Sequence, residues 1–190
     1  MPKWLARWIL RWFGMKVICP VPLPDKCVIP VVPHTSNWDF PLGLAVRRVL
    51  DESIGFVAKS SLFHWTIGWW FRWMGGVAVD RSKSNNFVQA VADIFARKKV
   101  FKLALAPEGT RARVDKLKTG FYYIAKTAKV PIVPCAFDWG KGEVRFGEPF
   151  FPSEDEAADF ARLYEFFRGV EGYYPADSFV PPLPKDSSAA

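Results

Sequence analysis

Short apolar runs alternate with helical segments along most of this chain, and this alternation restricts its possible folds more than any other feature. Apolar runs that predict strands lie at Cys27–Val32, Ile54–Ala58, Gly76–Val79 and Val100–Ala106. Strands that alternate with helices build a mainly parallel sheet covered on both faces. A chain of 190 residues is long enough for one such core. We therefore predict an α/β fold: a single domain with a mostly parallel central sheet flanked by helices.

The remaining elements follow from the same patterns. Two further strands are expected near Ile132–Phe137 and at Glu143–Phe146. Proline removes a donor from the hydrogen-bond ladder, so Pro30 predicts that the Cys27–Val32 strand lies at a sheet edge or ends there. Apolar residues at helical spacing predict helices at Asn37–Leu50, Leu62–Met74, Asn86–Arg97, Phe121–Lys129 and Glu154–Phe167.

We divide the chain into three parts on the basis of its composition. Residues 1–16 are expected to form an amphipathic helix at a membrane interface, and residues 17–174 the folded domain. The domain should begin with an extended connector over residues 17–26, which carry three prolines. Residues 175–190 are proline-rich at their start and predict a loose C-terminal tail.

The N-terminal helix combines tryptophans with basic residues. Arg7 and Arg11 interrupt its apolar segment, which is unlike a signal peptide, and the segment is too short to span a bilayer. Tryptophan mixed with lysine and arginine is typical of a helix that lies in the membrane interface. The alternative is a helix that packs its apolar stripe on the core. The aromatic residues at helical spacing are Trp4, Trp8, Trp12 and Phe13, alongside Leu5 and Ile9.

A second aromatic segment, residues 60–74, holds four of the nine tryptophans, Trp69 and Trp73 among them. The net charge is +7, which suits an anionic membrane or a nucleic acid. A nucleic-acid surface would interleave aromatic and basic residues on strands, and that pattern is absent, so we expect a membrane partner and no nucleic acid. We therefore predict membrane contacts by Trp4, Trp8, Trp12, Trp69 and Trp73.

Three cysteines without a C-x-x-C pair indicate a reducing compartment.

The strand Cys27–Val32 is followed by a histidine and, five residues later, an aspartate. Ser36-x-x-Asp39 fits a capping box, in which Asp39 accepts a hydrogen bond from the Ser36 amide. A carboxylate accepts several hydrogen bonds, so Asp39 can also orient His34 as a general base. Ser36 and Thr35 lack the surroundings of an activated nucleophile. A histidine–aspartate pair without a nucleophile suggests a base that activates a substrate hydroxyl.

Basic residues follow two other strands. Glu108-Gly109-Thr110-Arg111 comes after the strand Val100–Ala106, and Asp80-Arg81 after Gly76–Val79. Each basic run alone is compatible with a solvated surface. Because parallel strands deliver their carboxyl ends to one edge of a sheet, polar residues after three strands together favour a shared anion site.

Four segments resemble the motif blocks of the glycerolipid acyltransferase family in order and spacing. They are His34-x-x-x-x-Asp39, Gly76–Arg81, Pro107–Arg111 and Val130-Pro131-Ile132-Val133-Pro134. The resemblance implies O-acyl transfer from acyl-CoA or acyl-carrier protein to the hydroxyl of a lysolipid. The expected acceptor is 1-acylglycerol-3-phosphate, which would yield phosphatidic acid.

The resemblance also implies residue roles. His34 would be the general base and Asp39 its partner; Arg81 and Arg111 would hold the phosphate. Glu108, Gly109 and Thr110 belong to the same substrate-binding loop, and Val130–Pro134 would bind the acyl donor or pack the core. No metal or cofactor is implied beyond the acyl thioester. A peripheral position on the cytoplasmic face of the inner membrane is expected.

Departures from the family pattern leave the acceptor open. The family usually carries asparagine before the histidine, where this chain has Pro33; Asn37, Trp38 and Ala106 also depart from the commonest pattern. The alternatives are a lyso-aminolipid acceptor of the ornithine or glycine type, and a non-catalytic peripheral membrane-binding protein.

Overall fold

A computed structural model describes residues 1–59, 68–69, 75–79 and 84–183. The described helices are α1 (Lys3–Trp12), α2 (Asp39–Leu50), α4 (Ser84–Arg97), α5 (Gly120–Ala128), α6 (Glu156–Phe167) and the short 3₁₀ helix η2 (Pro175–Asp177). The strands are β1 (Lys16–Ile18), β2 (Lys26–Val32), β3 (Ile54–Lys59), β4 (Gly76–Val79), β5 (Phe101–Leu105), β6 (Cys135–Asp138) and β7 (Glu143–Phe146). Of the expected helix Leu62–Met74, only Gly68 and Trp69 are described, and they are helical.

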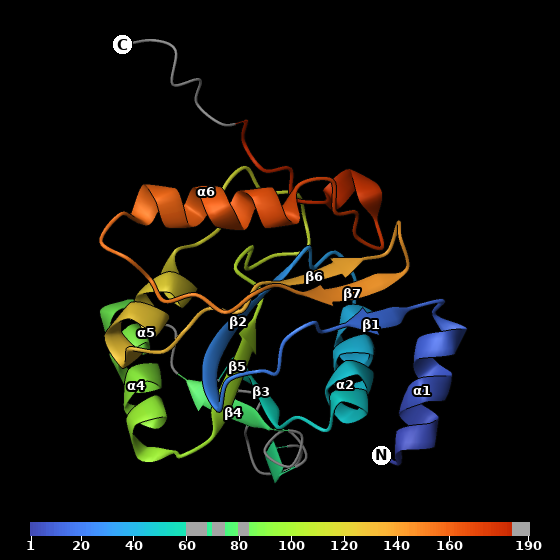
Figure 1. The fold of residues 1–190 in the computed structure, drawn as a ribbon, viewed down its shortest axis with the longest axis horizontal. Coiled ribbons are helices and arrows are strands. Elements are labelled where there is room, and N and C mark those ends of the chain that lie inside the picture. The colour runs from blue at the N-terminus through green and yellow to red at the C-terminus, as the bar shows by residue number, and fades with distance from the viewer. Residues whose placement is uncertain (60–67, 70–74, 80–83, 184–190) are drawn as a thin grey trace.

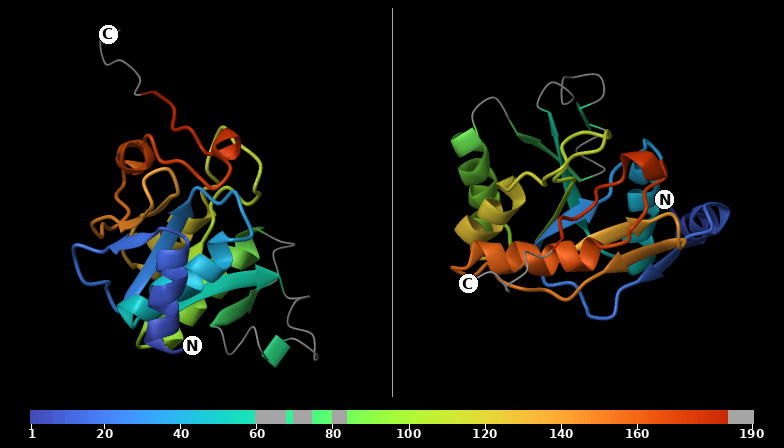
Figure 2. Two further views of the ribbon diagram at one scale, coloured as in Figure 1. Left: turned by 90° about the vertical axis from the view of Figure 1, so that its right-hand side faces the viewer. Right: turned by 90° about the horizontal axis from the view of Figure 1, so that it is seen from above.

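The strands form one seven-stranded sheet in the order β1-β7-β6-β2-β5-β3-β4. Every neighbouring pair is parallel except β6 and β7, which form an antiparallel hairpin. Helices cover both faces: α1 and α2 lie on one side, and α4 and α5 on the other (Figures 1 and 2). The predicted α/β fold, a single domain with a mostly parallel sheet, is confirmed.

Strand alternation on β2 builds the two halves of the core. Val28 and Val32 face the cluster that contains α4, α5 and α6. Cys27 and Ile29 face the opposite cluster, with α1 and α2. Because successive side chains of a strand point to opposite faces, a strand buried on both sides is apolar throughout, which explains the continuous apolar run of β2.

The position of β2 corrects our expectation for Pro30. The strand is central, between β6 and β5, and not at an edge. The Val28 amide donates to the Pro131 carbonyl, on the β6 side, and strand amides alternate in direction. The donor that Pro30 lacks would therefore point to the β6 side. On that side, position 30 lies between the isolated Val28–Ile132 bridge and the pairing of Val31 with Cys135. The hydrogen-bond ladder towards β6 is interrupted there, so the missing amide proton breaks no strand pairing.

Both ends of the domain differ from the expected division. The connector at residues 17–26 contains most of β1, which pairs with β7. The packed chain also extends past residue 175, where we had begun the tail: Ser178 is 5% exposed and Phe179 is 2% exposed. Phe179 completes the cluster beneath α6, so the residues just after Pro175 belong to the folded domain.

Helix α1 has two different faces. Ala6 and Leu10 are buried against the α2 side of the core. The tryptophans point away from it and are largely exposed, at 69% for Trp4, 58% for Trp8 and 64% for Trp12. The helix thus does pack on the core, but with Ala6 and Leu10, while the indoles stay largely exposed to solvent. No helix among the described residues has the length and apolarity needed to cross a bilayer.

Candidate active site

The two motif residues meet directly after β2. His34 follows the carboxyl end of the strand, and its Nδ1 lies 3.0 Å from Oδ2 of Asp39 in the first turn of α2. A carboxylate only accepts hydrogen bonds, so this contact requires the hydrogen on Nδ1 and leaves Nε2 as the basic atom. The His34 side chain is 27% exposed, while that of Asp39 is 2% exposed. The pair therefore has a buried carboxylate behind an imidazole that solutes can reach.

Helix α2 begins with Trp38 as its N-cap residue, so the predicted capping box forms only in part, but Asp39 makes both of the contacts expected of it. Its Oδ2 also accepts a hydrogen bond from the Ser36 amide at 3.0 Å, as the capping box requires. The other half of the box differs, because the Ser36 hydroxyl accepts from the Trp38 amide at 3.2 Å. Ser36 and Thr35 are each 3% exposed, which places both hydroxyls out of reach of a substrate. Neither is a nucleophile in this arrangement.

Glu108 links the end of β5 to the catalytic loop. Its Oε2 accepts a hydrogen bond from the His34 amide at 2.7 Å, and the residue is 3% exposed. Its Oε1 is buried without a hydrogen-bond partner among the described residues. Burial raises the pKa of Glu108 from 4.5 to about 7, against the lowering effect of the His34 amide. Glu108 thus fixes the backbone at His34, and its place in the substrate-binding loop stays a prediction.

A cavity of about 1870 Å³ opens beside the pair. His34 and Asp39 line it together with Gly109, Thr110 and Arg111 from the loop after β5. Much of the remaining wall is apolar and comes from β2, α2, β3, β5 and β6, including Val31, Phe40, Leu44, Phe56, Leu105 and Phe137. A cavity with a basic polar end and a long apolar wall fits an amphiphile with an anionic head and a hydrocarbon chain.

The loop after β5 depends on glycine at position 109. Gly109 has φ +68°, and a side chain there would collide with Lys118, which crosses the loop. The Lys118 amide donates a hydrogen bond to the Pro107 carbonyl at 2.8 Å, which joins the two ends of the loop. Arg111 and Lys118 both line the cavity, so the loop brings two cations to its polar end. A guanidinium and an ammonium suit a phosphate or a carboxylate.

The other expected site residues fall into two groups. Val130–Pro134 are all buried, and Ile132 bridges Val28 and Phe150, so this block packs the core. None of the five is among the described residues that line the cavity. Arg81 and Trp73 lie outside the described residues. Trp69 is described and is 65% exposed.

One partner of the site was missed in the sequence. Trp139, directly after β6, donates from its indole Nε1 to Oδ1 of Asp39 at 2.9 Å. The two residues are 100 positions apart, so no local pattern connects them. The only available signal was that Trp139 follows the strand predicted near Ile132–Phe137, at the sheet edge where β2 and β5 also end.

Comparison with known proteins identifies the family. A model of the acyltransferase family, described as "Acyltransferase", matches residues 15–138. The chain belongs to the acyltransferase family. An uncharacterized acyltransferase of Schizosaccharomyces pombe is 33% identical over 119 residues, which cover 58% of this chain and 42% of that protein.

Other relatives carry a more specific name. The 1-acyl-sn-glycerol-3-phosphate acyltransferase of Saccharomyces cerevisiae is 32% identical over 150 residues, 68% of this chain and 48% of its own length. That of Salmonella typhimurium is 29% identical over 132 residues, 64% of this chain and 52% of its own length. This acyltransferase thus spans about half the length of the curated relatives it matches.

A solved structure confirms the fold. The crystal structure of the 1-acyl-sn-glycerophosphate acyltransferase from Thermotoga maritima superposes with a TM-score of 0.58 at 20% identity. The match covers 84% of this chain and 73% of the other. The acyltransferase domain described above therefore has the architecture of that enzyme.

Proposed function

We propose that this acyltransferase moves a fatty acyl group from a thioester donor to the free hydroxyl of a lysolipid, and that its acceptor is 1-acylglycerol-3-phosphate. The observation that carries the proposal is the His34–Asp39 pair, whose Nδ1 and Oδ2 atoms are 3.0 Å apart. The pair lies on the wall of a cavity that has Arg111 and Lys118 at one end and mostly apolar side chains beyond them. Relatives from a bacterium and a yeast are named for this reaction.

The proposed mechanism uses His34 as base and then as acid. Nε2 takes the proton of the glycerol hydroxyl while its oxygen attacks the thioester carbonyl, and Asp39 stabilises the imidazolium that forms. The tetrahedral intermediate then breaks its carbon–sulfur bond, and the leaving thiolate takes the proton back from His34. The products are an ester and a free thiol. The hydroxyls of Thr35 and Ser36 are buried, so neither would carry the acyl group, which in this mechanism passes directly to the acceptor.

The basic end of the cavity would hold the acceptor head group. Arg111 offers a planar fork and Lys118 a compact charge, both on the cavity wall. We assign Arg81 to the same head group from its motif alone. The donor, acyl-CoA or acyl-carrier protein, carries phosphate in either case, so both fit a basic protein surface.

An acceptor panel tests this function. Purified protein is incubated with acyl-CoA or acyl-carrier protein and with lysophosphatidate, lyso-ornithine lipid, lyso-glycine lipid or no acceptor. Thiol release and the acylated product are measured together. We expect release that depends on lysophosphatidate, with phosphatidic acid as product. Activity confined to a lyso-aminolipid would replace the acceptor, and no release with any acceptor would favour a non-catalytic membrane-binding protein.

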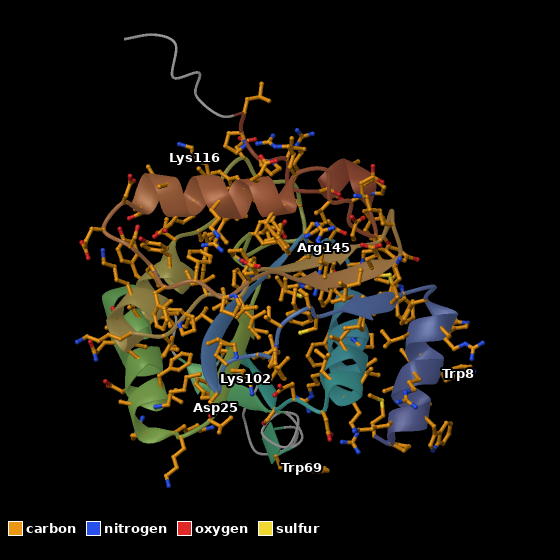
Figure 3. The ribbon with its side chains drawn as sticks, in the orientation of Figure 1. Trp8, Asp25, Trp69, Lys102, Lys116 and Arg145 are labelled. Carbon is orange, nitrogen blue, oxygen red and sulfur yellow. The ribbon has the colours of Figure 1, made fainter. Side chains whose placement is uncertain are left out.

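We also propose that the enzyme works as a peripheral protein on the cytoplasmic face of the inner membrane. Trp4, Trp8 and Trp12 are exposed along one face of α1, beside the exposed Arg7 and Arg11. Figure 3 shows Trp8 pointing outward from α1 and Trp69 projecting at the lower rim. Exposed indoles next to arginines suit the interface of an anionic bilayer.

The double variant Trp4→Ala, Trp8→Ala should bind anionic liposomes at least about tenfold more weakly, because it loses two indoles that would each insert apolar surface. Co-sedimentation with phosphatidylglycerol vesicles measures this. The control is Phe151→Ala, Leu183→Ala, which removes two apolar side chains that are 65% and 83% exposed outside α1. Equal binding by the Trp4, Trp8 variant and the wild type would mean that α1 does not contact lipid.

A further inference from the structure

Trp139 occupies a position that connects the catalytic pair to the rest of the domain. It is the first residue after β6, and its half-buried ring faces the start of α2. Its Nε1 donates to Oδ1 of Asp39 at 2.9 Å. The opposite oxygen, Oδ2, is already shared by the Ser36 amide and His34 Nδ1. Each oxygen of the carboxylate therefore has its own donor.

The buried carboxylate needs the indole to keep this arrangement. Asp39 is 3% exposed, so bulk water does not replace a missing donor at Oδ1. Without the indole N–H, one oxygen would lose its partner and the carboxylate could turn about its side-chain bond. Oδ2 of a rotated Asp39 carboxylate would no longer stay in place to accept the hydrogen bond from His34 Nδ1. The imidazole would then lose its fixed orientation.

Three contacts hold Trp139 in place, one through its backbone and two through its ring. Its backbone amide donates to the Glu171 carbonyl at 2.8 Å. The Tyr173 ring packs edge-on at 4.9 Å between centroids, and Phe13, just past the end of α1, packs edge-on at 5.5 Å. The ring thus lies between Phe13, at the C-terminal end of α1, and Tyr173, in the segment that follows α6.

The same C-terminal segment also touches the catalytic loop directly. The Tyr174 amide donates to the Thr35 hydroxyl at 3.1 Å. A side chain at Gly172 would come within 2.5 Å of that hydroxyl oxygen, so the two segments approach closely because this residue is glycine. Residues 171–174 therefore support both Trp139 and the turn that carries His34.

We propose that Trp139 is a positioning residue for catalysis: its indole N–H fixes the Asp39 carboxylate, which keeps the Nδ1 hydrogen of His34 in place and Nε2 directed at the acceptor hydroxyl. The assignment rests on the proposed function, since it presumes that His34 is the base. Phe13, Glu171 and Tyr173 hold the indole in the required place. The residue that ends the helix proposed to lie on the membrane, Phe13, thereby contacts the residue that orients the catalytic pair.

The variant Trp139→Phe keeps a ring but removes the donor. We expect kcat to fall about 10- to 100-fold, as for loss of a hydrogen bond to a buried charge, while KM for the lysolipid changes less than about twofold. The matched control is Tyr164→Phe, which removes a ring hydroxyl on α6, packed against Phe160 and Phe179. The control should retain both constants.

A spectroscopic readout separates positioning from general stability. The chain has two histidines, so the Nδ1 proton of His34 can be assigned by NMR with a His64→Gln variant. We expect the downfield resonance of the Nδ1–H bonded to Asp39 to broaden or move upfield in Trp139→Phe and to persist in Tyr164→Phe. Should Trp139→Phe fail to fold, Tyr173→Leu loosens the clamp while leaving every atom of Trp139, and a smaller fall in kcat with the same resonance change is expected.

Two results would overturn the proposal. One is wild-type kcat together with an unchanged His34 resonance in Trp139→Phe. The other is a lower melting temperature with equal changes in kcat and KM and an unchanged resonance, which would make Trp139 merely structural. If the wild type acylates no lysolipid but its His34 resonance still responds to Trp139→Phe, the proposed function fails while the contact between Trp139 and the pair stands.

Discussion

The His34→Ala variant should lose about 10³-fold in kcat for acyl transfer, within the range of 10²–10⁴ typical of a positioned general base. The substitution removes Nε2, the imidazole nitrogen that is left to act as the base once Nδ1 donates to Asp39. It leaves the fold of the loop in place, because Glu108 bonds to the backbone amide of residue 34 and not to its side chain. Initial rates at saturating lysophosphatidate measure the effect.

Two companion variants sharpen this test. Asp39→Asn should lose about 10²-fold, because an amide has one accepting oxygen while Ser36, His34 and Trp139 all donate to this side chain. His64→Ala, which removes the chain's other histidine, should retain activity. Near wild-type turnover by His34→Ala would show that the proton is taken by another group, and the proposed mechanism would be wrong.

The catalytic pair was accessible to sequence reasoning because its geometry is local. Strand β2 ends just before His34, and Asp39 lies in the first turn of the next helix, so the spacing alone brings the two together. The loop after β5 was accessible for a related reason: parallel strands end at one edge, which places Arg111 on the same cavity as His34.

Trp139 and residues 171–174 were not accessible, since their contacts with Asp39 and Thr35 join segments far apart in the chain. No local periodicity encodes such a contact. The edge position that we predicted from Pro30 was wrong for a similar reason. A proline marks a missing donor, but only the neighbouring strands determine whether that donor was needed, and at Pro30 the ladder with β6 is already broken.

Helix α1 shows a different limit of sequence patterns. Its tryptophans and its aliphatic residues form adjacent apolar stripes, and periodicity alone does not show which of them packs on the core. The structure decides: Ala6 and Leu10 are buried in the cluster that contains α2, while Trp4 and Trp8 remain outside. Periodicity therefore predicts the helix and its amphipathic character, while the tertiary packing assigns each face.

Glu108→Gln should change how the stability of the enzyme depends on pH. Burial raises the pKa of Glu108 from 4.5 to about 7. In this pH interval the folded state holds a proton that the unfolded state has released, so the free energy of unfolding falls as pH rises. The stability that the protonated Glu108 carboxyl contributes is fully present below pH 4.5 and is lost above about pH 7. A pKa raised from 4.5 to about 7 corresponds to about 3 kcal/mol.

Glutamine cannot ionise, so the variant should lack this loss. Urea unfolding at pH 5, 6, 7 and 8 should give a free energy that declines by about 2–3 kcal/mol less than in the wild type. At pH 8 the variant should be the more stable of the two. Its gain in unfolding free energy is reduced by the cost of burying an amide group where Oε1 of Glu108 has no hydrogen-bond partner among the described residues. The control is Glu148→Gln, whose carboxylate is 78% exposed and should leave the slope unchanged.

The variant also separates the two contributions of this carboxylate. Glutamine keeps an oxygen that accepts the His34 amide, so the catalytic loop should stay in place and the change should appear mainly in the pH dependence of stability. Parallel decline of wild type and Glu108→Gln between pH 5 and pH 8 would show that this carboxyl group does not titrate in that range. Its burial at the end of β5 would then be balanced by interactions other than the bond to His34.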